Sequence, residues 1–250
     1  MPLILVFVLS QVKLPWKFSE DLIAYDVIEE SPNFDYENFY QIISKPLKYL
    51  GNGRQAIAFA TDDGKYVLKF LTIKPIKDQK LFSRSKNCAC RRLKREKSVK
   101  RVMKNYIRVF QTLKNETGLI ALHFNPTEKK LGSCEIIDRN GNRSRIDLDR
   151  APFIFQHRGE PLTTVFSNKM SEEYRTLHQS FENFLERRAR LGFTDLNRGF
   201  NIDNYAFIGS QPAMIDPGNV IYSELQKQNP ESEIQRIHAL FHQRFSPQVD

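Results

Sequence analysis

The sequence contains little cysteine, and this scarcity excludes two kinds of scaffold. The three cysteines are Cys88, Cys90 and Cys134, an odd number without the regular spacing of a disulfide framework. Cys88 and Cys90 lack the two-residue spacing of a cysteine zinc site, and no matching Cys or His pair follows. The stability must therefore come from a hydrophobic core. A chain of 250 residues with 40% hydrophobic content suffices for one large core or for two lobes that share a cleft.

Long hydrophobic runs are also lacking. The apolar run near the N-terminus, Leu3 to Leu9, is too short to span a bilayer. No basic residue precedes it and no clear small-residue cleavage site follows. Two interpretations stay open: the run belongs to an export signal or membrane anchor, or it packs on the core as a strand or helix. The location is accordingly cytoplasmic in one case, and membrane-associated or secreted in the other.

The basic residues are concentrated in one stretch. Residues 74–108 hold fourteen Lys and Arg against Asp78 and Glu96, a local net charge of +12, whereas the whole chain has +9. Such a run is usually a solvated face. The alternative is a surface that binds an anionic partner, either a membrane or a nucleic acid.

Hydrophobic periodicity predicts an α+β chain. A short helix leading into a strand is expected over Tyr36–Leu50, and a mobile loop over Thr72–Asn87. Further helices are expected over Cys90–Leu113, Ser171–Leu191 and Ile234–Phe245. Strands are expected at Ala56–Ala60, Tyr66–Leu71, "GLIALHFNP", "SCEIIDRNGNRSRIDLD", "APFIFQHR", "YAFI" and "PAMID". Asn140-Gly141 favours a type I′ hairpin turn.

Four segments, in this order, resemble the protein-kinase-like superfamily. "LGNGRQAIAF" resembles its Gly-rich loop, with Gly51 and Gly53 at the first two glycine positions, and "YVLK" its strand lysine, Lys69. "TDLNRGFNIDN" resembles its catalytic loop and "IDPG" its Asp-Phe-Gly metal motif. The resemblance covers roughly residues 50–219. The hydrophobic N-terminus, the "YVLKF" strand and the "YAFI" hairpin are also similar to uncharacterised kinase-like proteins of chlamydia-type intracellular bacteria.

The resemblance implies a two-lobed fold with an antiparallel N-lobe sheet and a small helical C-lobe. An N-terminal apolar segment and linker would cover residues 1–35, the N-lobe residues 36–160 and the reduced C-lobe residues 161–250. It also implies that a monomer binds ATP and Mg²⁺ in the cleft and transfers phosphate to a hydroxyl acceptor on a protein or small molecule. Phosphoryl transfer depends mainly on positioning and charge neutralisation.

The resemblance also assigns roles to individual residues. Gly51 and Gly53 would let the backbone approach the nucleotide, and Lys69 would pair with the α- and β-phosphates. Glu96 would be the partner of Lys69, although it is equally an i,i+4 partner of Lys100. Asp195 would be the catalytic base. Asn204 and Asp216 would hold the Mg²⁺, while Asn201 is interpreted as a turn residue.

The departures from the family pattern favour a second hypothesis. Ala56 occupies the third glycine position, and Phe193 and Thr194 replace the histidine and arginine before the catalytic aspartate. Pro217 replaces the phenylalanine after Asp216, and no Ala-Pro-Glu element follows. The alternative is therefore a catalytically inactive pseudokinase, a nucleotide-binding or interaction module that docks anionic partners through its basic helix.

The histidines give a weaker signal. Only His238 and His242 have the i,i+4 spacing of a helical metal site, and no third ligand is close in the sequence. We expect these two side chains on a solvated face or at the edge of the core.

Overall fold

The structure, a computed structural model, describes residues 35–53, 56–71, 87–167, 172–195 and 199–245. For residues 87–96 and 172 it describes the helix but not the side chains. The expectations for the apolar N-terminal run and for the loop after Leu71 fall outside these ranges. Within the described residues, no helix combines the length and the apolar character that crossing a membrane requires.

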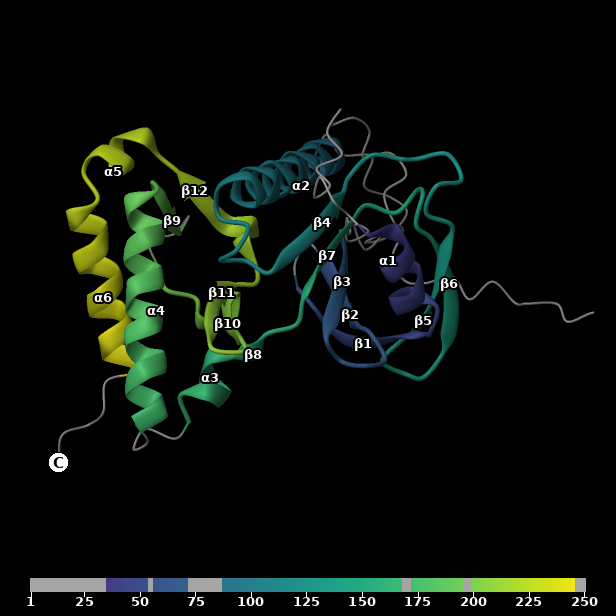
Figure 1. Cartoon of the computed structure of the whole chain (residues 1–250). Helices are drawn as coiled ribbons and strands as arrows, with labels where there is room; N and C mark the ends of the chain where they lie inside the picture. The colour runs from purple at the N-terminus through teal and green to yellow at the C-terminus, as the bar shows by residue number, and fades with distance from the viewer. Residues whose placement is uncertain (1–34, 54–55, 72–86, 168–171, 196–198, 246–250) are drawn as a thin grey trace, which may run out of the picture.

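The first half of the chain forms a seven-stranded sheet with the strand order β4-β7-β3-β2-β1-β5-β6 (Figure 1). Every neighbouring pair is antiparallel except β1 and β5, which are parallel. The bounds are α1 Tyr36–Ile43, β1 Leu47–Asn52, β2 Ala56–Ala60, β3 Tyr66–Leu71, α2 Asn87–Thr112, β4 Leu119–His123, β5 Ser133–Ile137, β6 Arg143–Asp147 and β7 Phe153–His157.

The second half is mainly helical. The long helices α4 and α6 lie side by side at the left of Figure 1, next to the small sheets β11-β10-β8 and β12-β9. The bounds are β8 Glu160–Pro161, α3 Leu162–Val165, α4 Glu172–Arg190, β9 Phe193–Asp195, η1 Ile202–Asn204, β10 Tyr205–Ile208, β11 Gln211–Met214, η2 Pro217–Asn219, β12 Val220–Tyr222, α5 Glu224–Gln228 and α6 Glu231–Phe245.

Each half buries its own group of aromatic side chains. In the sheet half, Phe39 of α1 stacks on Phe153 of β7, with 6.0 Å between the ring centroids. In the helical half, Phe181 of α4 packs on Phe241 of α6 at 5.0 Å. Burial of aromatic surface at this density supplies most of the driving force for folding. The two halves therefore have separate cores.

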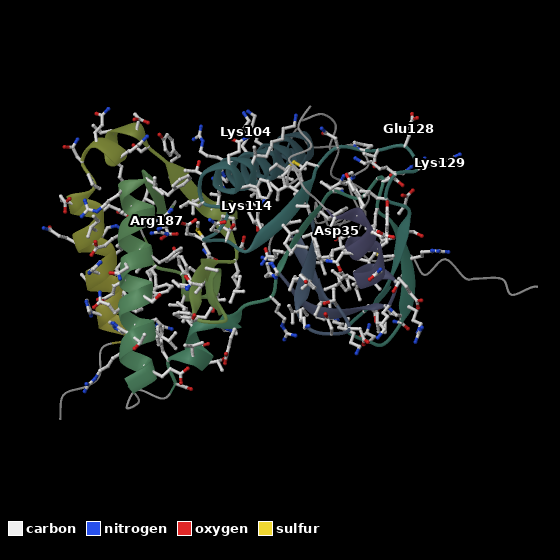
Figure 2. The ribbon with its side chains drawn as sticks, viewed as in Figure 1. Asp35, Lys104, Lys114, Glu128, Lys129 and Arg187 are labelled. Carbon is white, nitrogen blue, oxygen red and sulfur yellow. The ribbon has the colours of Figure 1, made fainter. Side chains whose placement is uncertain are left out.

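Helix α2 lies between the two halves, at the top of Figure 1. Its described apolar face, which includes Val102 and Tyr106, is buried, and it contacts both β4 and η2. Its opposite face exposes a row of basic side chains: Lys97, Lys100, Arg101, Lys104 and Arg108. Lys104 projects from this outer side in Figure 2. The binding of an anionic partner by residues 74–108 stays a prediction.

Most elements agree with the sequence predictions, and the predicted α+β class is confirmed. Strands β2 and β3 have the predicted bounds. The short elements α3, β9, β12 and α5 were not predicted, because segments of three to five residues carry too little periodicity.

The turn at Asn140-Gly141 corrects one prediction. A type I′ turn needs positive φ at both central residues, but here only Gly141 has it, with φ of 85°. The Gly141 amide donates to the Asp138 carbonyl, and the Asp138 carboxylate accepts from the amides of Asn140 and Asn142. The Asp138 side chain thus stabilises a longer loop, and the predicted type I′ turn was wrong.

Candidate functional site

A cavity of about 610 Å³ lies where the sheet half meets the helical half. Its size falls in the range of small-molecule and cofactor sites. The sheet half lines it from β1, β2, β3 and α2, and the helical half lines it from β9, η1, η2 and the segments beside them. Six of the residues predicted from the sequence line this cavity: Gly51, Gly53, Lys69, Asp195, Asn204 and Asp216. The side chain of the seventh, Glu96 on α2, lies outside the described residues.

Gly51 and Gly53 stand at the end of β1, where the backbone turns toward β2. The Gly53 amide donates to the Ala56 carbonyl at 2.9 Å. A Cβ atom added to Gly51 would meet no atom within 4 Å, and one added to Gly53 would meet only the Ala56 carbonyl oxygen, at 3.9 Å. The packing of the chain itself therefore does not require these glycines. Because neither glycine has a side chain, the backbone at both positions is accessible from the cavity.

Lys69 links the two halves of the molecule. It lies on β3 in register with Ala58 of β2 and Ile154 of β7, so its backbone is fixed in the middle of the sheet. Its ammonium donates to the carbonyl of Ile215, the residue before Asp216. Burial lowers the pKa of Lys69, and the negative charge of Asp216 opposes this effect. A half-buried lysine thus places its amine at the cavity beside a carboxylate.

Asp216 begins the short helix η2, and α2 fixes the segment. The Asp216 carboxylate accepts from the Tyr106 hydroxyl at 3.1 Å and from the Gly218 amide at 3.4 Å. The Asn105 side-chain amide donates to the carbonyls of Gly218 and Val220 at 2.9 and 2.8 Å. Burial raises the pKa of Tyr106 well above its usual value, and Asp216 adds to the shift. The hydroxyl therefore stays a proton donor to Asp216.

Tyr106 was missed as a site residue by the sequence analysis. Its spacing with the apolar residues of α2 is typical of a core position, and the ring is buried. A tyrosine at a core position does indicate that a polar group lies nearby, because a buried tyrosine hydroxyl needs a hydrogen-bond partner. Sequence alone does not identify that partner.

Two asparagines, Asn201 and Asn204, line the cavity from the helical half. The Asn204 carbonyl accepts from the amides of Ile215 and Asp216 at 2.8 and 3.3 Å, which places η1 beside the Asp216 segment. The Asn204 side-chain oxygen accepts from the Asn201 side-chain amide at 3.1 Å. Asn201 caps η1, as its interpretation as a turn residue requires, but it also lines the cavity. Both side chains are therefore candidates to hold a cation with Asp216.

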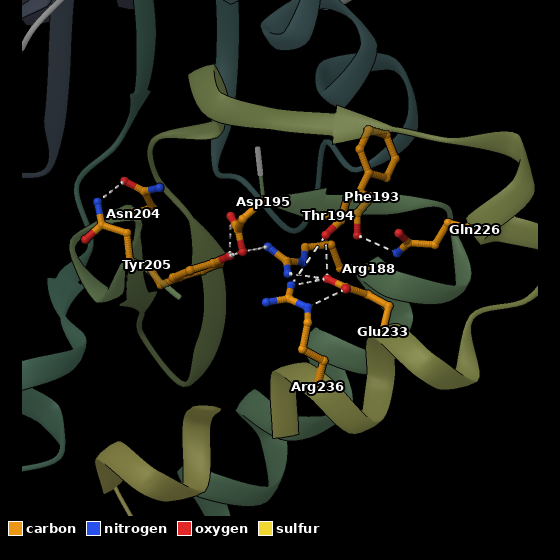
Figure 3. A network of polar contacts seen from close by, with 10 residues as sticks. Arg188, Phe193, Thr194, Asp195, Asn204, Tyr205, Gln226, Glu233 and Arg236 are labelled. Carbon is orange, nitrogen blue, oxygen red and sulfur yellow. Dashed lines mark hydrogen bonds and ion pairs between the residues drawn. The ribbon is translucent and has the colours of Figure 1, made fainter. Parts of the chain in front are cut away.

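Asp195 is buried, with 8% of its surface exposed, and belongs to an ionic network (Figure 3). Its carboxylate accepts from Arg188 Nη1 at 3.1 Å and faces the Tyr205 hydroxyl at 3.4 Å. Arg188 is fully buried and also donates to that hydroxyl. Glu233 of α6 completes the network, 3.9 Å from Arg188 Nη2. The Asp195 carboxylate is thus neutralised and held in place by α4.

Arg188 was also missed, although the sequence contained a signal. It continues the apolar face of α4 that includes Phe181, Phe184 and Leu185, at steps of three and four residues. An arginine on a buried face needs an acidic partner, because an unpaired buried charge is costly. The fold supplies Asp195 and Glu233.

No protein-family model matches the chain, and no curated protein matches it. Solved structures of WbdD, described as a bifunctional kinase-methyltransferase, show a resemblance. One has a TM-score of 0.44 and 13% identity over 78% of this chain and 36% of its own. A monomeric WbdD structure has a TM-score of 0.41 and 13% identity over 78% and 38%, respectively. The chain thus spans little more than a third of these structures. The similarity to proteins of chlamydia-type bacteria stays a prediction.

Proposed function

We propose that this protein is an atypical ATP- and Mg²⁺-dependent phosphotransferase that acts on a hydroxyl group of a protein or small molecule. One observation carries the proposal: a single cavity collects Lys69 and two glycines from the sheet half with Asp195, Asn204 and Asp216 from the helical half. These residue types fit the needs of phosphoryl transfer, which are phosphate positioning, a cation site and a hydroxyl acceptor held in place.

The sheet side of the cavity would hold the phosphates. Backbone near Gly51 and Gly53 is open toward the cavity, and Lys69 supplies a positive charge from a rigid strand. On binding, the Lys69 ammonium would exchange its contact with the Ile215 carbonyl for a phosphate oxygen. A charge-assisted hydrogen bond of this kind is stronger than one to a neutral carbonyl.

The helical side fits a hard cation. Asp216 offers a carboxylate, and the amides of Asn201 and Asn204 offer oxygen ligands in the same cavity. Mg²⁺ prefers oxygen ligands and binds through one or two carboxylates together with substrate phosphates. Bound there, it would neutralise phosphate charge. Tyr106 would keep the Asp216 carboxylate oriented toward the cavity.

Asp195 would position the acceptor hydroxyl and take its proton. Its contact with Arg188 fixes the carboxylate but also occupies one of its two oxygens, which leaves less of the group free to take a proton from an acceptor. This same contact favours the second candidate function, a pseudokinase-type module that binds nucleotide without transfer.

The test combines thermal unfolding with an assay of ATP turnover. Purified protein is heated with ATP and Mg²⁺, and with ATP and EDTA. Ligand bound only to the folded state at a hundredfold its Kd adds about 2.7 kcal/mol of stability. We expect a Mg²⁺-dependent rise of the midpoint that is lost in Asp216→Asn, which keeps the side-chain shape but removes the charge.

The matched control is Asp203→Asn, an exposed aspartate on η1 that does not line the cavity. It should keep the shift. A shift with release of phosphate from ATP supports the phosphotransferase, whereas a shift without turnover in the wild-type protein selects the pseudokinase. The absence of a shift in the wild-type protein overturns both.

A further inference from the structure

A polar seam joins α4 and α6 along their length. Arg190 pairs with Glu231 at 3.0 Å, and Arg188 lies 3.9 Å from Glu233. Toward the other end, His238 lies 3.3 Å from Glu186. Rising residue numbers on α4 meet falling numbers on α6, so the two helices are antiparallel. They lie side by side in Figure 1.

The far end of this seam brings two histidines and a glutamate together. His178 and Glu182 are four residues apart on α4, and His242 approaches from α6. One ligand atom from each of the three lies within 4.8 Å of the other two. His242 Nε2 is 2.8 Å from Glu182 Oε1, and His178 Nδ1 is 3.6 Å from Glu182 Oε2. No third ligand is close to the i,i+4 pair His238 and His242 in the sequence, but the fold brings His178 and Glu182 of α4 next to His242.

The cluster has an inner part and an entrance. The side chains of His178 and Glu182 are only 13% and 11% exposed, whereas that of His242 is 46% exposed. Among the described residues, the buried Nε2 of His178 has no hydrogen-bond partner.

We propose that His178, Glu182 and His242 bind a transition-metal ion of the Zn²⁺ type, which clamps α4 to α6. Two imidazoles and one carboxylate form a set of three protein ligands that Zn²⁺ accepts, with water or His238 at the fourth position. Zinc–ligand bonds of about 2.0–2.2 Å require the three ligand atoms, which lie within 4.8 Å of one another, to point at one ion. The half-exposed side chain of His242 has room for this adjustment. Mg²⁺ is excluded by chemistry, since it demands oxygen ligands in near-octahedral geometry.

The clamp would act on the helices that hold Asp195. Arg188 lies ten residues after His178 on α4, about 15 Å along the helix axis at 1.5 Å per residue. Glu233 stands correspondingly at the other end of α6. The proposed metal site is thus separate from the cavity and independent of the nucleotide proposal.

The test titrates the metal-free full chain with Co²⁺ and with Zn²⁺. Tetrahedral Co²⁺ gives intense visible absorption, and thiolate ligation adds a near-ultraviolet charge-transfer band that would reveal binding at Cys88 or Cys90 instead. We expect tetrahedral absorption without the thiolate band, displacement by Zn²⁺ at one equivalent, and a higher unfolding midpoint with Zn²⁺. Mg²⁺ should not compete.

Two variants and one control locate the site. His242→Gln and Glu182→Gln should each weaken Zn²⁺ binding by at least about tenfold, as even second-shell changes do in metal sites. His157→Gln changes an exposed histidine on β7, in the other half, and should bind like the wild-type protein. If Glu182→Gln does not fold, exposed His242→Gln carries the test alone. Binding unchanged in His242→Gln, or no binding in the wild-type protein, overturns the proposal.

Discussion

The Tyr106 hydroxyl donates to the Asp216 carboxylate at 3.1 Å, joining two residues that are 110 positions apart in the chain. Tyr106 comes from α2, which lies between the halves, and Asp216 from the start of η2. The hydrogen bonds of Tyr106 and Asn105 together attach the segment after β11 to α2. Pro217 follows Asp216 in this segment, which α2 anchors by these hydrogen bonds.

We expect Tyr106→Phe to lower the free energy of unfolding by about 1.5–3 kcal/mol, the range for a hydrogen bond to a charged group. The ring would still fill its place in the core, so packing changes little. Urea unfolding measures the difference. Tyr49→Phe, which removes a hydrogen bond from Tyr49 to Asn52 near the surface, serves as the control and should cost about 1 kcal/mol or less. Equal losses in both variants would contradict a special role for the Asp216 contact.

Lys69→Met should separate stability from ligand binding. Methionine fills similar space without a charge, and burial of the Lys69 charge already costs stability, as the lowered pKa shows. The folded state bears this penalty while the Lys69 amine is charged, and the penalty disappears as the pH rises through the lowered pKa toward 10.5. We therefore expect unfolding stability at pH 7 within about 1 kcal/mol of wild type.

The same variant should bind ATP and Mg²⁺ at least about tenfold more weakly, which corresponds to about 1.4 kcal/mol. Calorimetric titration measures the affinity, and chemical denaturation the stability. Wild-type affinity in Lys69→Met would remove Lys69 from the proposed phosphate site.

Asp149 should make the sheet half sensitive to acid. Burial alone would raise its pKa, but a hydrogen bond from Thr127 and three from the backbone amides of residues 130–132 lower it to about 2. Because the folded pKa lies below the ordinary 3.8, the stabilisation is present above about pH 4 and is lost as the pH falls toward 2.

At pH 7, Asp149→Asn should lower the free energy of unfolding by about 1–2 kcal/mol after allowance for solvent screening. The difference in unfolding free energy between this variant and the wild-type protein should become smaller as the pH falls from 4 to 2. Urea unfolding across this range measures it, with exposed Asp203→Asn as the control that should show little difference at any pH. A gap that stays constant with pH would contradict the assignment.

Arg188→Met should destabilise the helical half strongly. Removing the guanidinium leaves the buried Asp195 and Glu233 without their shared partner, which typically costs about 3–5 kcal/mol. Adding Asp195→Asn should restore part of the loss, because one uncompensated charge disappears. Arg187→Met, which removes an exposed side chain paired with Glu116, should cost about 1 kcal/mol or less. Additive losses in the Arg188 and Asp195 double variant would contradict the coupling.

Local signals accounted for most of the fold. Strands β2 and β3 follow from two short apolar runs on either side of an Asp-Gly turn, and α2, α4 and α6 follow from helical spacing. These signals act over a few residues, so a single sequence reveals them. The motifs that resemble a known family also contained six of the residues that line the cavity.

The sequence by itself thus determined the elements, the α+β two-lobed class and six residues of the candidate site. Only the tertiary structure decided which side chains meet: Tyr106 with Asp216, Arg188 with Asp195, and His242 with Glu182. The physical reason is that such contacts depend on how helices pack against the rest of the chain. Many nonspecific apolar contacts share the packing energy of the helices. The local pattern of residues therefore does not predict which polar side chains the packing brings together.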